Sequence, residues 1–181
     1  MAAARSWRPS MKRRALPAVI AGLALAAYMS SRDNSRTTPA AGDRQTATVV
    51  RVTDGDTVVL SGLGRSRLIG IDTPEVYGRP GCFGREASAY TKQLLQPGDR
   101  VRYRLGREPR DRYQRPLIYL WLDDDRFVNE MLIIGGYAVP LTIPPNDDYA
   151  ARFKSLAGRA QQQRAGLWSS GTCNGRPDAP A

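Results

Sequence analysis

Residues 46–75 read TATVVRVTDGDTVVLSGLGRSRLIGIDTPE, and the spacing of turn signals in this stretch decides the fold. The DG pair at 54–55 and the glycines of SGLG at 61–64 interrupt short β-branched and apolar runs. Runs of this kind, bounded by glycine and aspartate, are typical of strands joined by tight turns. The stretch therefore predicts a meander of three strands, at 46–53, 57–60 and 67–71.

The chain after this meander changes its period. Ala87, Tyr90 and Leu94 recur at helical spacing, so a helix is predicted at 84–95. The alternating run at 101–105 predicts a half-buried strand, and the continuous apolar run at 117–122 predicts a buried one.

Two further helices follow these strands. The first is marked by Phe127, Met131 and Ile134, and Asn146-Asp147-Asp148 is expected to cap the second, in which Tyr149, Phe153, Leu156 and Ala160 share one face. Five short strands with three helices predict an α+β fold, mainly β, built as a small closed barrel.

Two acidic clusters with one arginine between them are the main chemical signal. Asp54 and Asp56 form the first cluster, Asp72 and Glu75 form the second, and Arg67 lies between them. Converging carboxylates make an oxygen-rich site for a divalent cation, and an arginine among them suggests that a phosphate also binds. Metal, phosphate and carboxylate base together indicate phosphodiester hydrolysis, although each cluster alone is compatible with an ordinary turn.

The geometry of these clusters sets a condition. Arg67 and Asp72 lie five residues apart on one predicted strand, so they point to opposite faces unless a bulge or a barrel bend intervenes. A third charged segment, DRYQR at 111–115, leads into the apolar strand. Arg115 therefore stands either at the start of a buried strand or in a solvated turn.

Composition excludes several classes of enzyme. The 181 residues allow one domain with short tails, and 27 Lys and Arg against 17 Asp and Glu give a formal charge of +10. The chain contains no histidine, which excludes Ser-His-Asp triads, His-ligated zinc sites and histidine-based nucleases. Acid–base chemistry must come from other side chains or from metal-bound water.

The N-terminus is typical of a targeting segment. Five cations before residue 15 precede an apolar run at 15–29. This pattern predicts that residues 1–29 are a signal peptide or an uncleaved signal anchor. A mitochondrial presequence is a further interpretation. Residues 30–44 predict a flexible linker, 45–170 the domain, and 171–181 a C-terminal tail. We expect the protein to be secreted or anchored in a membrane, with the domain outside the cytoplasm.

The only two cysteines are Cys82 and Cys173. Two cysteines in an exported protein favour the prediction of one disulfide. The alternative is two unpaired thiols.

The stretch from about 46 to 168 resembles the staphylococcal-nuclease (thermonuclease) family, an OB-fold endonuclease. The matching words, in the family's order, are DGDT, RLIGIDTPE, GREASAYTK, DRYQR, VNEML and GLWS. The resemblance implies a monomeric, calcium-dependent nuclease acting on DNA and RNA, with a five-stranded OB-fold barrel. A catalytically silent binding module for nucleic acid or protein is the alternative.

The resemblance also implies a set of calcium ligands. By motif position, Asp56 and Asp72 would bind Ca²⁺ through their side chains and Thr73 through its backbone carbonyl. Asp54 would lie just outside these ligands.

The remaining roles concern the substrate. Glu75 would position or deprotonate the attacking water, and Arg67 and Arg115 would bind the scissile phosphate. Tyr113 would contact the nucleotide, and Arg112 takes the place of a phosphate-contacting cation. The chain departs from the family in its short loop at 75–84, and in Gln114 and Pro116, where glycines are usual.

Overall fold

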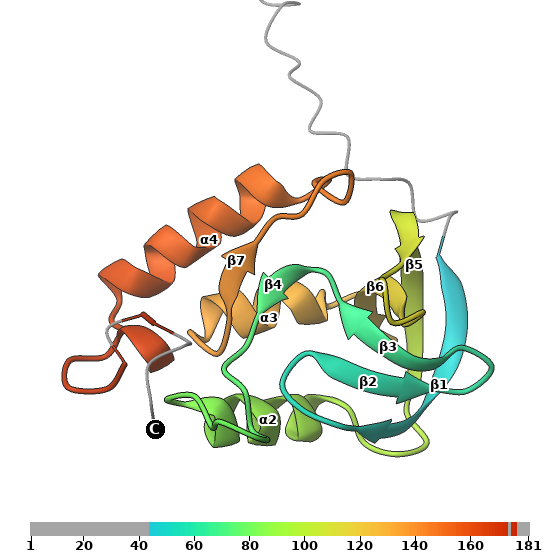
Figure 1. Cartoon of the computed structure of the whole chain (residues 1–181), viewed down its shortest axis with the longest axis horizontal. Coiled ribbons are helices and arrows are strands. Elements are labelled where there is room, and N and C mark those ends of the chain that lie inside the picture. Colours follow the sequence, from blue (N-terminus) through green and yellow to red (C-terminus); the bar gives the residue numbers. More distant parts are fainter. Residues whose placement is uncertain (1–43, 174, 177–181) are drawn as a thin grey trace, which may run out of the picture. The chain divides into compact units, whose positions relative to one another are not determined.

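The computed structural model describes residues 44–173 and 175–176, which include a closed five-stranded barrel (Figure 1). The barrel strands, in the order β1-β2-β3-β6-β5, are β1 Gln45–Val52, β2 Thr57–Leu60, β3 Gly64–Leu68, β6 Pro116–Leu122 and β5 Arg100–Arg110. β1 closes the ring by pairing antiparallel with β5, whereas β3 and β6 pair in parallel. The predicted OB-fold barrel is confirmed.

The third strand of the predicted meander is interrupted. The chain leaves the barrel after Leu68, and the next strand, β4 Gly70–Asp72, pairs instead with β7 Val139–Leu141. Gly70 has a φ of 80°, and a Cβ there would lie 2.5 Å from the ring of Phe153, so only glycine fits this turn. A single strand over 67–71 was therefore the wrong expectation.

β7 was not predicted from the sequence. It has three residues with Pro140 at its centre, and proline is unusual within a strand because it has no N–H to donate. The strand is tolerated because β4 and β7 form a separate two-stranded sheet outside the barrel.

Three α-helices pack against the strands. They are α2 Gly84–Leu94, α3 Val128–Ile134 and α4 Ala150–Gln162, followed by the short 3-10 helix η2 Gly166–Trp168. α3 contacts both α2 and α4 and lies between them (Figure 1). The sequence located all three helices to within a few residues.

The predicted cap of the last helix is wrong. Tyr149 precedes α4, and no side chain caps its first turn. Asp148 instead forms an ion pair with Arg104 of β5, and Asn146 exchanges two hydrogen bonds with the backbone of Glu108. Contacts with β5 therefore satisfy the groups that local sequence reasoning assigned to the helix.

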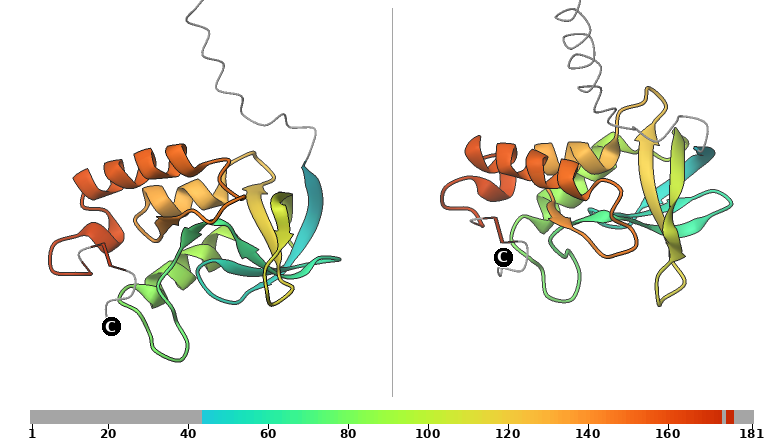
Figure 2. Two further views of the ribbon diagram at one scale, coloured as in Figure 1. Left: turned by 45° about the horizontal axis from the view of Figure 1, so that its top comes forward. Right: turned by 90° about the horizontal axis from the view of Figure 1, so that it is seen from above.

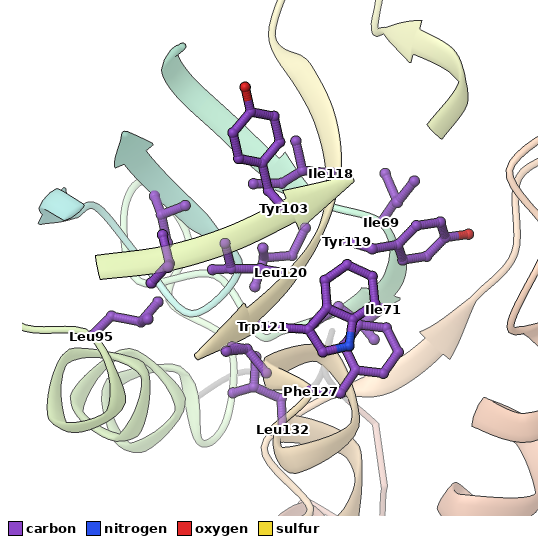
Figure 3. Close-up of a cluster of buried hydrophobic side chains, with 14 of the residues drawn as sticks. Ile69, Ile71, Leu95, Tyr103, Ile118, Tyr119, Leu120, Trp121, Phe127 and Leu132 are labelled. Atoms are coloured by element: carbon purple, nitrogen blue, oxygen red, sulfur yellow. The ribbon is translucent and has the colours of Figure 1, made fainter. Parts of the chain in front are cut away.

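The core joins the barrel to the helices (Figure 3). Trp121 of β6 stacks on Phe127, with ring centroids 4.5 Å apart, just before α3 begins. Ile69 and Ile71, on either side of Gly70, are both buried in the same cluster. Burial of each such side chain contributes about 1.5–3 kcal/mol, so packing holds both sides of the strand break in place.

A disulfide joins the C-terminal turn to the segment before α2. Cys82 and Cys173 are bonded, as the sequence favoured, and the reading of two free thiols is wrong. The bond links positions 91 residues apart, which corresponds to about 4–5 kcal/mol in the chain-entropy model.

The predicted signal or anchor at 1–29 and all but the last residue of the predicted linker lie outside the described residues. Within the described ranges, no helix is both long and apolar enough to cross a membrane.

Candidate active site

Two carboxylates and one arginine meet at the break between β3 and β4. Arg67 donates through Nη1 to Asp56 Oδ1 and through Nη2 to Asp72 Oδ1, the latter at 2.8 Å. The turn at Gly70 brings Asp72 back toward the face of Arg67. It is the bend without which the two side chains would point to opposite faces of one strand. We call Asp54, Asp56, Arg67 and Asp72 the acid wall.

The DGDT turn is packed tightly against the DTPE segment. Asp56 Oδ2 accepts hydrogen bonds from the backbone N–H and the hydroxyl of Thr73, at 3.0 and 2.9 Å. A Cβ at Gly55 would lie 2.6 Å from the Thr73 hydroxyl oxygen, so glycine is required for this approach. Thr91 of α2 donates to the Gly55 carbonyl at 2.7 Å. α2 therefore supports the acid wall from behind.

A buried amide fixes the strand break itself. Asn129 of α3 is fully buried, donates to the Ile69 carbonyl at 2.9 Å and accepts from the Leu120 N–H at 3.1 Å. It thereby ties the end of β3 to β6. The sequence argument assigned no role to Asn129 or Thr91, although both lie within the words VNEML and GREASAYTK that carried the family resemblance.

Burial changes the protonation chemistry of the acid wall. Removal from water raises the pKa of Asp56 to about 6, while the Arg67 guanidinium opposes this and the neighbouring Asp54 adds to it. Burial lowers the pKa of Arg67, but Asp56 and Asp72 raise it, and the net direction is upward. The arginine therefore stays charged and compensates the carboxylates.

The turn between β5 and β6 forms a second, exposed wall. We call residues 110–116 the arginine hairpin; it projects from the barrel at the tip of these strands (Figure 2). Asp111 organises it by accepting from the backbone N–H groups of Tyr113 and Arg115 and from Arg115 Nε, at 2.9, 2.9 and 2.7 Å. Burial raises the pKa of Asp111, but its bonds with Arg115 lower it more, so the net pKa lies below the usual value.

This arrangement leaves the end of Arg115 available. Its Nε is bound to Asp111, and neither Nη atom makes a hydrogen bond within the described part of the chain. Arg112 donates to the hydroxyl of its neighbour Tyr113, whose side chain is exposed. The hairpin thus presents guanidinium N–H groups and an aromatic face outward.

Both walls border one groove of about 610 Å³. Its lining includes the predicted residues Arg67, Asp72, Glu75 and Arg115, so the sequence-based expectation that these groups converge is met. Arg112 and Tyr113 also line it, whereas Asp56 is the buried member of the acid wall and does not line the groove. The groove also has an exposed apolar lip that was not found from the sequence, comprising Leu141, Ile143 and Pro144.

Glu75 is exposed, but its backbone is held firmly. Its carbonyl accepts the Gly81 N–H at 2.8 Å, and a Cβ at Gly84 would lie 2.3 Å from that carbonyl oxygen. Cys82, within the same short loop, is bonded to Cys173. The loop therefore fixes the backbone position of Glu75 and leaves its side chain free to move.

The donor atoms at the acid wall suit a hard cation. Among residues 44–173 and 175–176, no group of three or more Asp, Glu, Cys or His side chains is arranged to hold a metal ion. Asp56 and Asp72 are nevertheless held close together, because both bind the Arg67 guanidinium. Carboxylate oxygens are ligands that a hard divalent cation prefers, with its other ligands supplied by water and substrate.

Comparison with known proteins agrees with this geometry. The family model described as staphylococcal nuclease homologue matches residues 65–170. The Thermonuclease of Staphylococcus intermedius is 40% identical over 127 residues, which cover 66% of this chain and 74% of that protein. The Thermonuclease of Staphylococcus hyicus is 36% identical over 135 residues, covering 71% and 78%. Endonuclease YhcR of Bacillus subtilis (strain 168) is 32% identical over 145 residues, 72% of this chain but 12% of YhcR.

Proposed function

This chain belongs to the staphylococcal nuclease family and is a phosphodiester-hydrolysing nuclease, and from that premise we propose that it is a calcium-dependent endonuclease acting on DNA and RNA outside the cytoplasm. The observation that carries the proposal is the groove in which Arg67, Asp72, Glu75 and Arg115 lie together. Guanidinium groups and carboxylates meeting in one open groove are what in-line attack on a phosphodiester requires.

Each wall of the groove has a distinct task in hydrolysis. Arg115 offers its two Nη groups to the phosphate oxygens. The two N–H donors stabilise the negative charge that builds up on these oxygens in the transition state. Glu75 is exposed and acts as the base that orients and deprotonates the attacking water. Tyr113 offers its ring to a base, and Arg112 offers a cation to the phosphate backbone.

The acid wall would hold the cation. Asp56 and Asp72 would supply carboxylate oxygens and Thr73 its carbonyl, with Asp54 adding negative charge close by. Calcium bound there would supply Lewis acidity toward the phosphate and lower the pKa of bound water. Arg67, which already bridges the two carboxylates, keeps them apart and aligned and lies at the groove for contact with the phosphate.

Export is supported by two independent features. The N-terminal segment has the composition of a signal peptide or anchor. The Cys82–Cys173 disulfide suits an oxidising compartment.

A chelation assay tests the proposed function. Full-length protein is incubated with single-stranded DNA, and separately with RNA, in calcium and then in excess EGTA. We expect cleavage of both substrates that stops on chelation and returns with added calcium. Cleavage that survives EGTA contradicts the calcium requirement, whereas binding without cleavage supports the silent binding module instead.

A further inference from the structure

A second cavity adjoins the groove, and two residues of its lining, Arg65 and Arg110, have no role in the proposed hydrolysis. It has a volume of about 680 Å³ and lies between the β2–β3 turn and the arginine hairpin. It shares Glu75, Arg110, Tyr113 and Arg115 with the groove, so the two are continuous past the proposed base. Cavities of about 300–1,000 Å³ accept ligands of nucleotide size.

Arg65 forms the far side of this cavity. It lies two residues before Arg67 on β3, so both side chains leave the same face of the strand, while Ser66 and Leu68 point into the barrel. β3 and β6 pair in parallel with Arg67 beside Leu117. Arg65 of β3 and Arg115 of the arginine hairpin both line the cavity.

Two of the three arginines that line this cavity, Arg65 and Arg110, have no carboxylate partner within the described residues. Arg65 is exposed, and its guanidinium has no hydrogen bond or ion pair there. Arg110 donates only to the carbonyl of Gln114, at 2.8 Å, and has no carboxylate partner in the same part of the chain. Arg104 and Arg107, on the outer side of β5, are both paired with Asp148.

This contrast identifies the kind of ligand. Arginines that stabilise the fold here have aspartates beside them, as Arg115 has in Asp111. Arg65 and Arg110, by contrast, place two further positive charges at the same hollow without a carboxylate partner in the described part of the chain. Grouped like charges repel one another, and an anion relieves that repulsion. The neighbouring Leu63 and Pro116 add apolar surface suited to a sugar or base edge.

We propose that Arg65 and Arg110 bind the phosphodiester next to the scissile one, so that a single strand of nucleic acid runs from the groove across Glu75 into the second cavity. The proposal rests on the nuclease function and refines its substrate: a polynucleotide with at least two phosphodiesters is preferred over a dinucleotide. Arg65 binds substrate and does not touch the reacting phosphate.

Kinetics on two substrate lengths tests the proposal. Arg65→Ala is compared with Arg159→Ala, which removes an exposed arginine from α4, away from both cavities. For each variant, kcat/KM is measured on a 12-nucleotide DNA strand and on a dinucleotide. We expect Arg65→Ala to lower the ratio of the two values about tenfold and Arg159→Ala to leave it unchanged. Equal losses on both substrates, or no loss, overturn the proposal.

A binding experiment separates the failure of this site from failure of the nuclease function. The salt dependence of binding to the same 12-nucleotide strand is measured in a Glu75→Gln background, with and without Arg65→Ala. Loss of one phosphate contact is expected to reduce the slope of log K against log salt by about 0.7, and Arg65→Lys should restore it because lysine keeps the charge. An unchanged slope excludes the second phosphate site even if calcium-dependent cleavage is observed. If wild-type protein cleaves nothing, a reduced slope still supports the site.

Discussion

The acid wall and the arginine hairpin face the same groove but are built in opposite ways. In the acid wall, Asp56 is buried, and Arg67 spends both Nη groups on carboxylates of the protein. In the hairpin, Arg115 uses only Nε within the described residues, and its two Nη groups remain available. Two arginines expected to do the same task therefore have different surroundings.

The difference shows how one site combines rigidity with binding. Buried charges need partners, because an uncompensated charge in the interior costs several kcal/mol. The geometry of the acid wall therefore depends on the fold around it, and the stability of the fold depends on the ion pairs of the acid wall. The hairpin is exposed, so its side chains bind ligand with little consequence for stability. Substitutions in the two walls should separate activity from folding.

The largest effect is expected from a paired comparison of Arg67→Ala with Arg115→Ala. Both should lower the rate of DNA cleavage about 10²–10³-fold, because each removes a donor to the phosphate. Only Arg67→Ala should also lower the free energy of unfolding, by about 3 kcal/mol or more, because it leaves Asp56 buried without its partner. Cleavage rates and urea unfolding are measured on both variants, with Arg159→Ala as control. Equal loss of stability in both variants would mean that the two walls do not differ as described.

The second effect concerns pH in metal-free buffer. The pKa of Asp56 is about 6 in the folded protein, where burial raises it, and 3.8 in the unfolded chain, so between these pH values the folded protein binds more protons. The contribution of Asp56 to the free energy of unfolding therefore falls as pH rises from about 4 to about 6, by on the order of 3 kcal/mol.

Urea unfolding in EDTA at pH 4 and pH 7 measures this contribution. The stability of wild type relative to Asp56→Asn should be greater at pH 4 than at pH 7, because asparagine does not titrate. A difference between the two proteins that stays constant with pH would show that Asp56 remains ionised throughout.

A third comparison uses two amides that make the same kind of bridge. Asn129 joins Ile69 and Leu120 in the interior, whereas Asn146 joins both backbone groups of Glu108 near the apolar lip. Asn129→Ala should cost about 2–3 kcal/mol of stability because two buried backbone groups lose their partners.

Asn146→Ala should cost about 1 kcal/mol, since Glu108 is exposed and water can replace the amide. Thermal unfolding of the two variants gives the comparison. A larger loss of stability in Asn146→Ala than in Asn129→Ala would contradict the view that the buried amide at the strand break contributes more to stability.

The smallest effect is expected at the tip of the hairpin. Tyr113 and Tyr77 are 64% and 63% exposed, but Tyr77 lines neither cavity. Tyr113→Ala should weaken binding of single-stranded DNA by about 1–2 kcal/mol through loss of stacking, with unchanged stability. Tyr77→Ala serves as the matched control in the same fluorescence titration. Equal losses in both would show that the hairpin has no special contact with the nucleotide.

The sequence by itself located the three helices and the barrel strands other than β3, and it singled out Arg67, Asp72, Glu75 and Arg115. Turn signals, helical spacing and the order of short motifs are local properties, so they can be read without coordinates. The absence of histidine and the grouping of Asp56, Asp72 and Glu75 restricted the chemistry in the same way.

Only the tertiary structure decided how those residues face one another. The break at Gly70 turns Asp72 toward Arg67 because Phe153, from a helix some 80 residues later, fills the space of a side chain there. Asn129 and Thr91 support the site through bonds to backbone groups far away in the sequence. The free ends of Arg115 and Arg65 likewise depend on which carboxylates lie nearby. Contacts between distant segments are set by packing, and no local pattern records them.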